Sequence, residues 1–214
     1  MKEEDLKAVA FYRKHDFGGE PEYYNIGDDV TFWQGDDFND KYLSLIVIKP
    51  AKVHCYQHST GKGVHKVYAK GDYPSLDELE GLSKFLVIPD NAYWAIALRL
   101  IDETKSPVGR YQLTFVAHGL GKTAIESSHK DDSAKYAQLE STTSDNEITC
   151  ALYVRDMQTG AYVITGSIHL HFDSTHGVIS VDDINVAEES TFHLEPHLVD
   201  NTKFDLIMSE KHAS

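Results

Sequence analysis

The stretch Gly35–Val47, GDDFNDKYLSLIV, decides how this sequence is interpreted. Its first six residues include three aspartates and one asparagine, and an apolar run from Leu43 to Val47 follows at once. Asp and Asn side chains are common in turns, so one interpretation is an ordinary solvated turn. Their oxygens are also the ligands that calcium prefers, so the other interpretation is one part of a metal site.

Length and composition favour a globular protein with substantial cores. The chain has 214 residues, of which 41% are hydrophobic. This matches one large β domain or two domains of about a hundred residues each. The formal net charge is −14. Such a surface cannot neutralise phosphates, so we expect no nucleic-acid partner, and it suits a cation such as calcium.

The first residues, MKEEDLKAVAFY, do not resemble a signal peptide, because acidic residues stand where a basic segment belongs and no apolar core follows. No window approaches the roughly eighteen apolar residues of a membrane-spanning helix, so we expect no transmembrane segment. The sequence therefore predicts a chain made in the cytoplasm. Cys55 and Cys150 each lie in a strand-like run and are predicted to be free, buried thiols.

Strand-like runs separated by Gly, Asp, Asn and Pro recur throughout the chain, which predicts an all-β fold. These runs are 6–14, 20–26, 42–48, 52–58, 64–70, 83–89, 93–102, 109–118, 147–156, 161–173, 177–186, 191–199 and 204–210. Only SLDELEGL, at 75–82, could form a short helical turn. Pro89 and the turn residues Asp90 and Asn91 predict a boundary between one domain at 1–89 and a second at 90–214.

The first domain contains an internal repeat with a period near forty residues. Phe11 and Tyr12 are followed after four residues by Phe17-Gly18-Gly19, and Cys55 and Tyr56 are followed after four residues by Gly61-Lys62-Gly63. Each half then has an acidic loop and a closing strand, NDKYLSLIV in one and LEGLSKFLV in the other. Glycine at such a place lets a hairpin fold back on itself with positive φ.

The spacing Y-x4-F-G-G, followed about twenty residues later by N-D-x-x-x-S, resembles the Greek-key motif of the βγ-crystallin superfamily. The later segments YWAIALRLID, GRYQLTF and EITCALYVRD extend the resemblance to the calcium-dependent cell-adhesion molecules of social amoebae. The resemblance implies two domains. The first is a βγ-crystallin-like double Greek key whose two motifs intercalate, and the second is an immunoglobulin-like β-sandwich.

The resemblance also implies how the two acidic loops would bind calcium. In the family, one ion takes a backbone carbonyl from the third loop position, a hydroxyl from the fifth, and a side chain from the second position of the other loop. Applied to this sequence, one complete site would use the Gly81 carbonyl, the Ser83 hydroxyl and the Asp40 carboxylate. We therefore expect one good calcium site.

The second site implied by the resemblance would use the Lys41 carbonyl and the Glu80 carboxylate, but Leu43 has no oxygen at the fifth position. Ser44 could compensate only if the loop shifts, because adjacent strand residues point to opposite faces. We expect this site to be weaker. The remaining candidate ligands are Asn39, beside Asp40 in its loop, and Asp90, near the domain boundary.

The function implied by the resemblance is calcium-dependent cell–cell adhesion by self-association. The protein would reach the outer cell surface through the contractile vacuole and stay there peripherally, its C-terminal domain held by a membrane-anchored docking protein. Two alternatives are an intracellular calcium-binding structural or stress protein and a lectin-like glycan-binding module.

Other sequence features are weaker. His169 and His171 alternate on one strand and predict a solvent-facing pair rather than a transition-metal site, since no third ligand is visible nearby. We find no recognisable Ser-His-Asp order or Cys-His pair, so we expect no enzyme activity.

Overall fold

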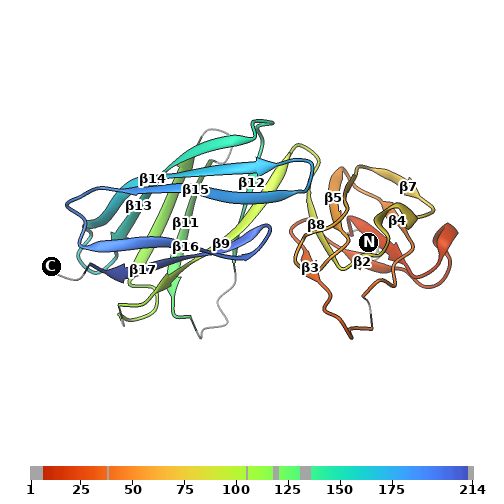
Figure 1. The fold of residues 1–214 in the computed structure, drawn as a ribbon, viewed down its shortest axis with the longest axis horizontal. Coiled ribbons are helices and arrows are strands. Elements are labelled where there is room, and N and C mark those ends of the chain that lie inside the picture. Colours follow the sequence, from red (N-terminus) through yellow and green to blue (C-terminus); the bar gives the residue numbers. More distant parts are fainter. Residues whose placement is uncertain (1–6, 38, 105, 118–120, 131–135, 212–214) are drawn as a thin grey trace. The chain divides into compact units, whose positions relative to one another are not determined.

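A computed structural model describes residues 7–37, 39–104, 106–117, 121–130 and 136–211. The chain divides into two compact units: residues 1–94 with 174–177, called unit 1, and residues 95–173 with 178–214, called unit 2. Both units consist of strands, which confirms the all-β prediction (Figure 1). The predicted boundary after residue 89 stays a prediction.

Unit 1 is built from short strands and two single-turn 3-10 helices. Their bounds are β1 Val9–Tyr12, η2 His15–Phe17, β2 Glu22–Tyr24, β3 Asp29–Thr31, β4 Ser44–Val47, β5 Ala51–Tyr56, β6 His65–Tyr68, β7 Gly71–Tyr73, η3 Asp77–Leu79 and β8 Lys84–Pro89. The turn η3 lies within the segment that the sequence predicted could form a helical turn.

The two halves of unit 1 exchange one strand each. One sheet has the order β2-β1-β4-β7, and the other has the order β3-β8-β5-β6. Strand β3 therefore comes from the first half but lies in the second sheet, whereas β7 does the reverse. This exchange intercalates the two repeats, which confirms the predicted double Greek key.

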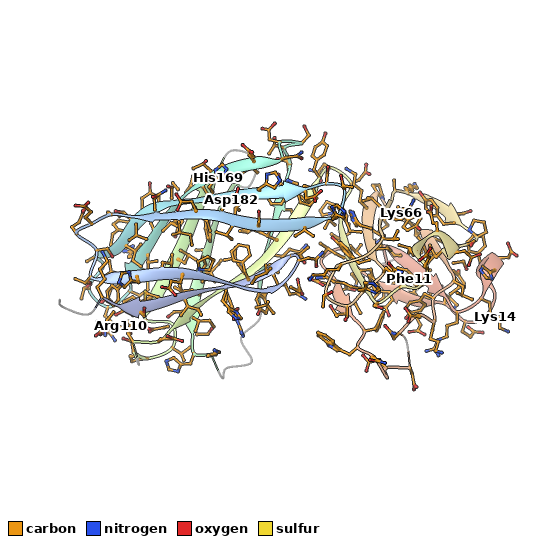
Figure 2. All side chains as sticks on the ribbon, viewed as in Figure 1. Phe11, Lys14, Lys66, Arg110, His169 and Asp182 are labelled. Atoms are coloured by element: carbon orange, nitrogen blue, oxygen red, sulfur yellow. The ribbon has the colours of Figure 1, made fainter. Side chains whose placement is uncertain are left out.

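Aromatic side chains form the centre of unit 1. Phe11 is fully buried and is labelled in Figure 2. Its ring centroid lies 4.6 Å from that of Phe85 and 4.9 Å from that of Tyr42. Cys55 is buried in the same core as a free thiol, as predicted. Each of these large buried rings removes much apolar surface from water and so stabilises the unit.

Unit 2 is a larger antiparallel assembly with two parallel pairings. Its strands are β9 Trp94–Asp102, β10 Tyr111–Ala117, β11 Gly121–Ser128, β12 Ala137–Ser141, β13 Glu147–Asp156, β14 Tyr162–Asp173, β15 Val178–Val186, β16 Phe192–Asp200 and β17 Lys203–Glu210. The order is β15-β14-β13-β10-β11-β9-β17-β16, with β12 paired to β9. Strand β9 runs parallel to both β11 and β17.

The strands of unit 2 keep one face on the core. Exposed and buried residues alternate along β13, as expected for a strand with one buried face. Cys150 on this strand is a free buried thiol opposite Ile168 of β14, as predicted. The described residues contain no helix long and apolar enough to cross a membrane. The immunoglobulin-like character of this unit stays a prediction.

Four strands of the structure were not expected from the sequence. They are β3, β7, β11 and β12, with the sequences DVT, GDY, GKTAIESS and AQLES. Each contains few apolar residues, so local alternation does not reveal it. Backbone pairing holds each of them in place: β3 pairs with β8, β7 with β4, β11 with β10 and β12 with β9. These partners are distant in the sequence or more apolar, so the signal for the strand lies in the partner rather than in the strand itself.

Candidate metal centre

The two acidic loops of unit 1 occupy equivalent places in the two repeats. The backbone N–H of Leu43 donates to the carbonyl oxygen of Tyr12 at 2.8 Å, and that of Ser83 donates to the carbonyl oxygen of Tyr56 at 3.1 Å. The fifth residues of both loops therefore make the same bond. This is the alignment of the two loops that the closing strands predicted.

The second residue of each loop has the same unusual backbone conformation. Asp40 and Glu80 are left-handed, with φ of 57° and 54°. Few residues other than glycine adopt this conformation, and Asp does so more readily than most. The N–H of Asp40 also donates to the carbonyl oxygen of Leu82 at 3.1 Å. That bond ties the first loop directly to the second.

A cavity of about 420 Å³ lies where the loops meet. Its lining consists almost entirely of polar side chains: Gln34, Asn39, Asp40, Gln57, His58, Ser59, Thr60, Glu80 and Ser83. Four of these are predicted ligands, namely Asn39, Asp40, Glu80 and Ser83. The structure thus gathers carboxylate, amide and hydroxyl groups from both repeats around one space.

Asp40 and Ser83 come closest to forming a preassembled pair. The Ser83 hydroxyl lies 3.4 Å from Asp40 Oδ1. Gly81 stands directly beside them, because a Cβ added there would lie 2.5 Å from the same Oδ1. The absence of a side chain at Gly81 lets the carboxylate approach the backbone of the other loop. These are the three residues that the resemblance assigned to the complete site.

The other two predicted ligands in the cavity, Glu80 and Asn39, each take part in a hydrogen bond between an amide and a carboxylate. Gln57 Nε2 donates to Glu80 Oε2 at 3.3 Å, and Asn39 Nδ2 donates to Asp40 Oδ2 at 2.7 Å. Gln57, with Ser59 and Thr60 in the same hairpin, was not anticipated as part of the site. The sequence signal for them was weak, because neutral polar residues after a strand are ordinary turn residues.

Besides Gly81, which lies beside Asp40, three predicted ligands do not line the cavity. Ser44 is fully buried, donates to the carbonyl oxygen of Lys14 at 2.7 Å, and accepts from the N–H of Phe17 at 3.1 Å. Its hydroxyl closes the folded hairpin of the first repeat. Lys41 is exposed, and Asp90 lies in the turn after β8. Their roles as ligands stay predictions.

The equivalent place in the first repeat is less suited to a cation. Residues 13–16, Arg-Lys-His-Asp, stand where the second repeat has residues 57–60, Gln-His-Ser-Thr, which include no lysine or arginine. His15 Nε2 lies 2.7 Å from Asp77 Oδ1, and this bond holds the pKa of Asp77 below its usual value. Leu43 adds no oxygen. Basic side chains and a missing ligand both weaken cation binding at this second place.

The residues around the cavity fit a hard cation. The donors available are carboxylates, an amide oxygen and a hydroxyl, which is the oxygen chemistry of calcium rather than that of zinc. Within the described ranges no group of three or more His, Cys, Asp or Glu is placed to hold a metal. A site here would therefore depend on neutral oxygens as well as on Asp40 and Glu80.

The histidine pair of unit 2 is less suited to a metal. Figure 2 labels His169 and Asp182. His169 Nδ1 lies 3.0 Å from Thr149 Oγ1, and its Nε2 lies 3.9 Å from Asp182 Oδ2. His171 Nδ1 lies 3.8 Å from Glu147 Oε1. Each histidine thus has its own polar neighbour, which favours the predicted solvent-facing pair.

Comparison with known proteins gives two family matches. Residues 5–89 match the family described as Beta/Gamma crystallin, and residues 96–209 match the family described as Membrane binding. Calcium-dependent cell adhesion molecule 1 of Dictyostelium discoideum is 29% identical over 208 residues, covering 94% of this chain and 95% of that protein. The resemblance stated from the sequence is therefore confirmed.

Two solved structures are also similar. Abundant Perithecial Protein of Neurospora crassa is 26% identical with a TM-score of 0.46, and 95% of each chain is covered. A βγ-crystallin domain of that protein in its Ca²⁺-bound form is 33% identical with a TM-score of 0.37, covering 40% of this chain and 91% of the other. Because the match over 96–209 spans more than half of the 214 residues, the chain belongs to the membrane-binding family.

Proposed function

We propose that this chain is a calcium-binding adhesion protein that acts at the cell surface by self-association. The observation that carries the proposal is the cavity where Asp40 and Ser83, from different repeats, converge beside Gly81. The name of the relative, a calcium-dependent cell adhesion molecule, supports the same function. The proposal assigns no catalytic activity to the chain.

Three residues would hold the ion in this proposal: Asp40 through its carboxylate, Ser83 through its hydroxyl and Gly81 through its carbonyl. Glu80 and Asn39 line the same cavity and supply further oxygens. The ion supplies positive charge that neutralises carboxylates from two loops. The N–H of Asp40 and the hydroxyl of Ser83 already join the two loops, and a shared ligand set would hold them further in this arrangement.

Ordering of the loops and neutralisation of charge would both favour self-association. Copies of a chain with net charge −14 repel one another at low ionic strength. Neutralising carboxylates lowers this repulsion. A loop that is already ordered has less conformational freedom to lose when it docks, so the free energy of association improves.

The C-terminal half would hold the protein on the membrane. The description of the family that residues 96–209 match supports this role. Direct contact with the bilayer is the simpler form of the proposal, since it needs no second protein. The membrane-anchored docking protein and the contractile-vacuole route stay predictions.

Bead aggregation tests the proposal. Beads coated with the full chain should cluster in millimolar calcium and disperse in chelator, and beads coated with Asp40→Ala should cluster far less. Clustering that ignores calcium, or that needs glycan and survives chelation, would contradict the proposal.

A thermal melt separates calcium binding from adhesion. A ligand that binds only the folded state adds about 2.7 kcal/mol at a hundred times its Kd, so calcium should raise the Tm of the full chain. A raised Tm without clustering would retain the calcium site and reject adhesion. An unchanged Tm would reject the site itself.

A further inference from the structure

We infer that one end of unit 2 is the surface that contacts the membrane, and that it prefers zwitterionic lipid to anionic lipid. Three apolar side chains project there, Val108, Met157 and Tyr162, which we call the apolar tip. This inference rests on the membrane-binding part of the proposed function. It adds the residues that make the contact and the charge class of the lipid.

Hydrogen bonds place the apolar tip at a single end of the unit. The N–H of Met157 donates to the carbonyl oxygen of Arg110 at 2.8 Å, and Val108 lies two residues before Arg110 in the same turn. Tyr162 begins β14 opposite Arg155 of β13. Figure 2 labels Arg110 at this end of the unit.

The tip residues are unusually exposed for their type. Val108 is 59% exposed, Met157 47% and Tyr162 64%. Single exposed apolar residues are common on protein surfaces and need no explanation. The three tip residues lie on adjoining turns at one end of the unit and so form a group. Groups of exposed apolar side chains mark surfaces that contact another protein or a membrane.

A hollow continues from the tip along the outer face of the sheet. It has a volume of about 270 Å³ and is lined by Thr114, Val116, Tyr153, Tyr162 and Thr165, none of them charged. The rings of Tyr153 and Tyr162 meet edge to face, with centroids 5.9 Å apart. Tyrosine has an apolar ring and a polar hydroxyl, which suits it to the level of lipid headgroups.

The charges at this end and the net charge of the chain both bear on the kind of lipid. Arg110 Nη2 lies 3.0 Å from Asp156 Oδ2, so this cation is already paired. Glu188 and Glu189 are exposed on the turn that follows β15. Ser190, next in that turn, donates to the carbonyl oxygen of Val163 at 2.8 Å, which places the turn beside the start of β14. Arg155 Nε at this end donates to the carbonyl oxygen of Gly160, and Lys211 Nζ donates to that of Glu188, so the local charges are mixed. The net charge of −14 on the whole chain opposes approach to anionic lipid.

Insertion of apolar side chains is favoured at this end over electrostatic attachment. Apolar side chains gain free energy in proportion to the area that leaves water. A polybasic surface would gain instead from anionic lipid, but the described charges at this end are mixed. Arg110 is paired with Asp156, and the exposed Arg155 is accompanied by the exposed Glu188 and Glu189. A bilayer interface without net charge is the partner that suits both features.

Vesicle co-sedimentation with the full chain tests the inference. Wild type is compared with the triple variant Val108→Ser, Met157→Ser, Tyr162→Ser, on vesicles of phosphatidylcholine and on vesicles containing phosphatidylserine. A matched control, Leu198→Ser with Val199→Ser, removes two exposed apolar side chains from β16 of the same unit. Circular dichroism checks that every variant is folded.

We expect wild type and the control to bind phosphatidylcholine vesicles, and the triple variant to bind about tenfold or more weakly. Phosphatidylserine should weaken wild-type binding. Equal binding by wild type and the triple variant would overturn the inference while leaving membrane binding intact. No binding of wild type to either vesicle would reject membrane contact altogether, and binding to saccharide instead would assign the hollow to a glycan.

Discussion

Leu43 and Ser83 make the same backbone hydrogen bond in the two repeats, but only Ser83 brings an oxygen to its loop. The N–H of Leu43 donates to Tyr12 and that of Ser83 to Tyr56. The Ser83 hydroxyl lies 3.4 Å from Asp40 Oδ1. In the proposed function, the difference in loop oxygens between the stronger and the weaker calcium site therefore lies in this one side chain.

Leu43→Ser should strengthen the second calcium site. It supplies the hydroxyl that the fifth position lacks, and one added ligand is worth roughly 1 kcal/mol, or about fivefold in Kd. The basic hairpin at 13–16 should keep this site weaker than the first. Calorimetric titration measures both sites. Leu43→Ala loses the same packing without adding a hydroxyl, and equal titrations for the two variants would contradict the assignment.

Ser83→Ala and Ser44→Ala should impair different properties, calcium binding in the first case and stability in the second. Ser83→Ala should weaken calcium binding about tenfold and change stability little, because its hydroxyl faces Asp40. Ser44→Ala should lower the free energy of unfolding by about 1–3 kcal/mol, because it removes the fully buried Ser44 hydroxyl and leaves the partly buried N–H of Phe17 without its acceptor. Calorimetry and denaturant unfolding separate the two. A larger loss of calcium affinity for Ser44→Ala would show that the two loops are wrongly aligned.

Asp40→Ala should weaken calcium binding more than Asn39→Ala. Asp40 contributes a full negative charge, whereas Asn39 Nδ2 donates to Asp40 Oδ2 at 2.7 Å and so mainly orients that carboxylate. We expect about a tenfold or greater loss for Asp40→Ala and a severalfold loss for Asn39→Ala. Calcium titration of both variants checks the order, and a reversed order would make Asn39 the principal ligand.

Gly81→Ala should reduce calcium affinity, in addition to lowering stability through backbone strain. A Cβ there would lie 2.5 Å from Asp40 Oδ1, and φ at this residue is 121°. Gly19→Ala is the matched control, since φ is 92° and nothing lies within 4 Å of an added Cβ. Both variants should lose about 1 kcal/mol or more of stability. Only Gly81→Ala should displace the carboxylate, and equal calcium affinity in both would contradict this.

His54 should make unit 1 less stable in acid. Burial, then the neighbouring His65 and Lys52, lowers the pKa of His54 to about 3. Its Nδ1 lies 3.1 Å from His65 Nε2. Between about pH 6.5 and this value the unfolded chain binds a proton that the folded chain excludes, so stability falls as pH falls. Above about pH 6.5 this contribution to stability is fully present.

Denaturant unfolding at several pH values measures this effect. The contribution of His54 is up to about 1.4 kcal/mol per pH unit below pH 6.5. His54→Gln should reduce the slope of unfolding free energy against pH by that amount, whatever the stability of the variant at neutral pH. Equal slopes for wild type and His54→Gln would refute the role of burial.

Much of unit 1 could be predicted because its signals are local. Each repeat has its own glycine-containing hairpin and closing strand, and both appear in the sequence at the same spacing. The left-handed φ values of Phe17 and Gly61, 59° and 76°, show that even a residue other than glycine takes the hairpin conformation here. The hidden strands β3 and β7 were not predictable, because their partners lie in the other repeat.

The sequence by itself determined the all-β fold, the repeat and the chemistry of the loops, because alternation, spacing and side-chain type are properties of short segments. Only the tertiary structure decided that Gln57, Ser59 and Thr60 join the cavity, and that the Ser44 hydroxyl closes a hairpin. The physical reason is the strand exchange. It brings loops from different repeats together through long-range pairing, and no local pattern specifies which hairpin will face which loop.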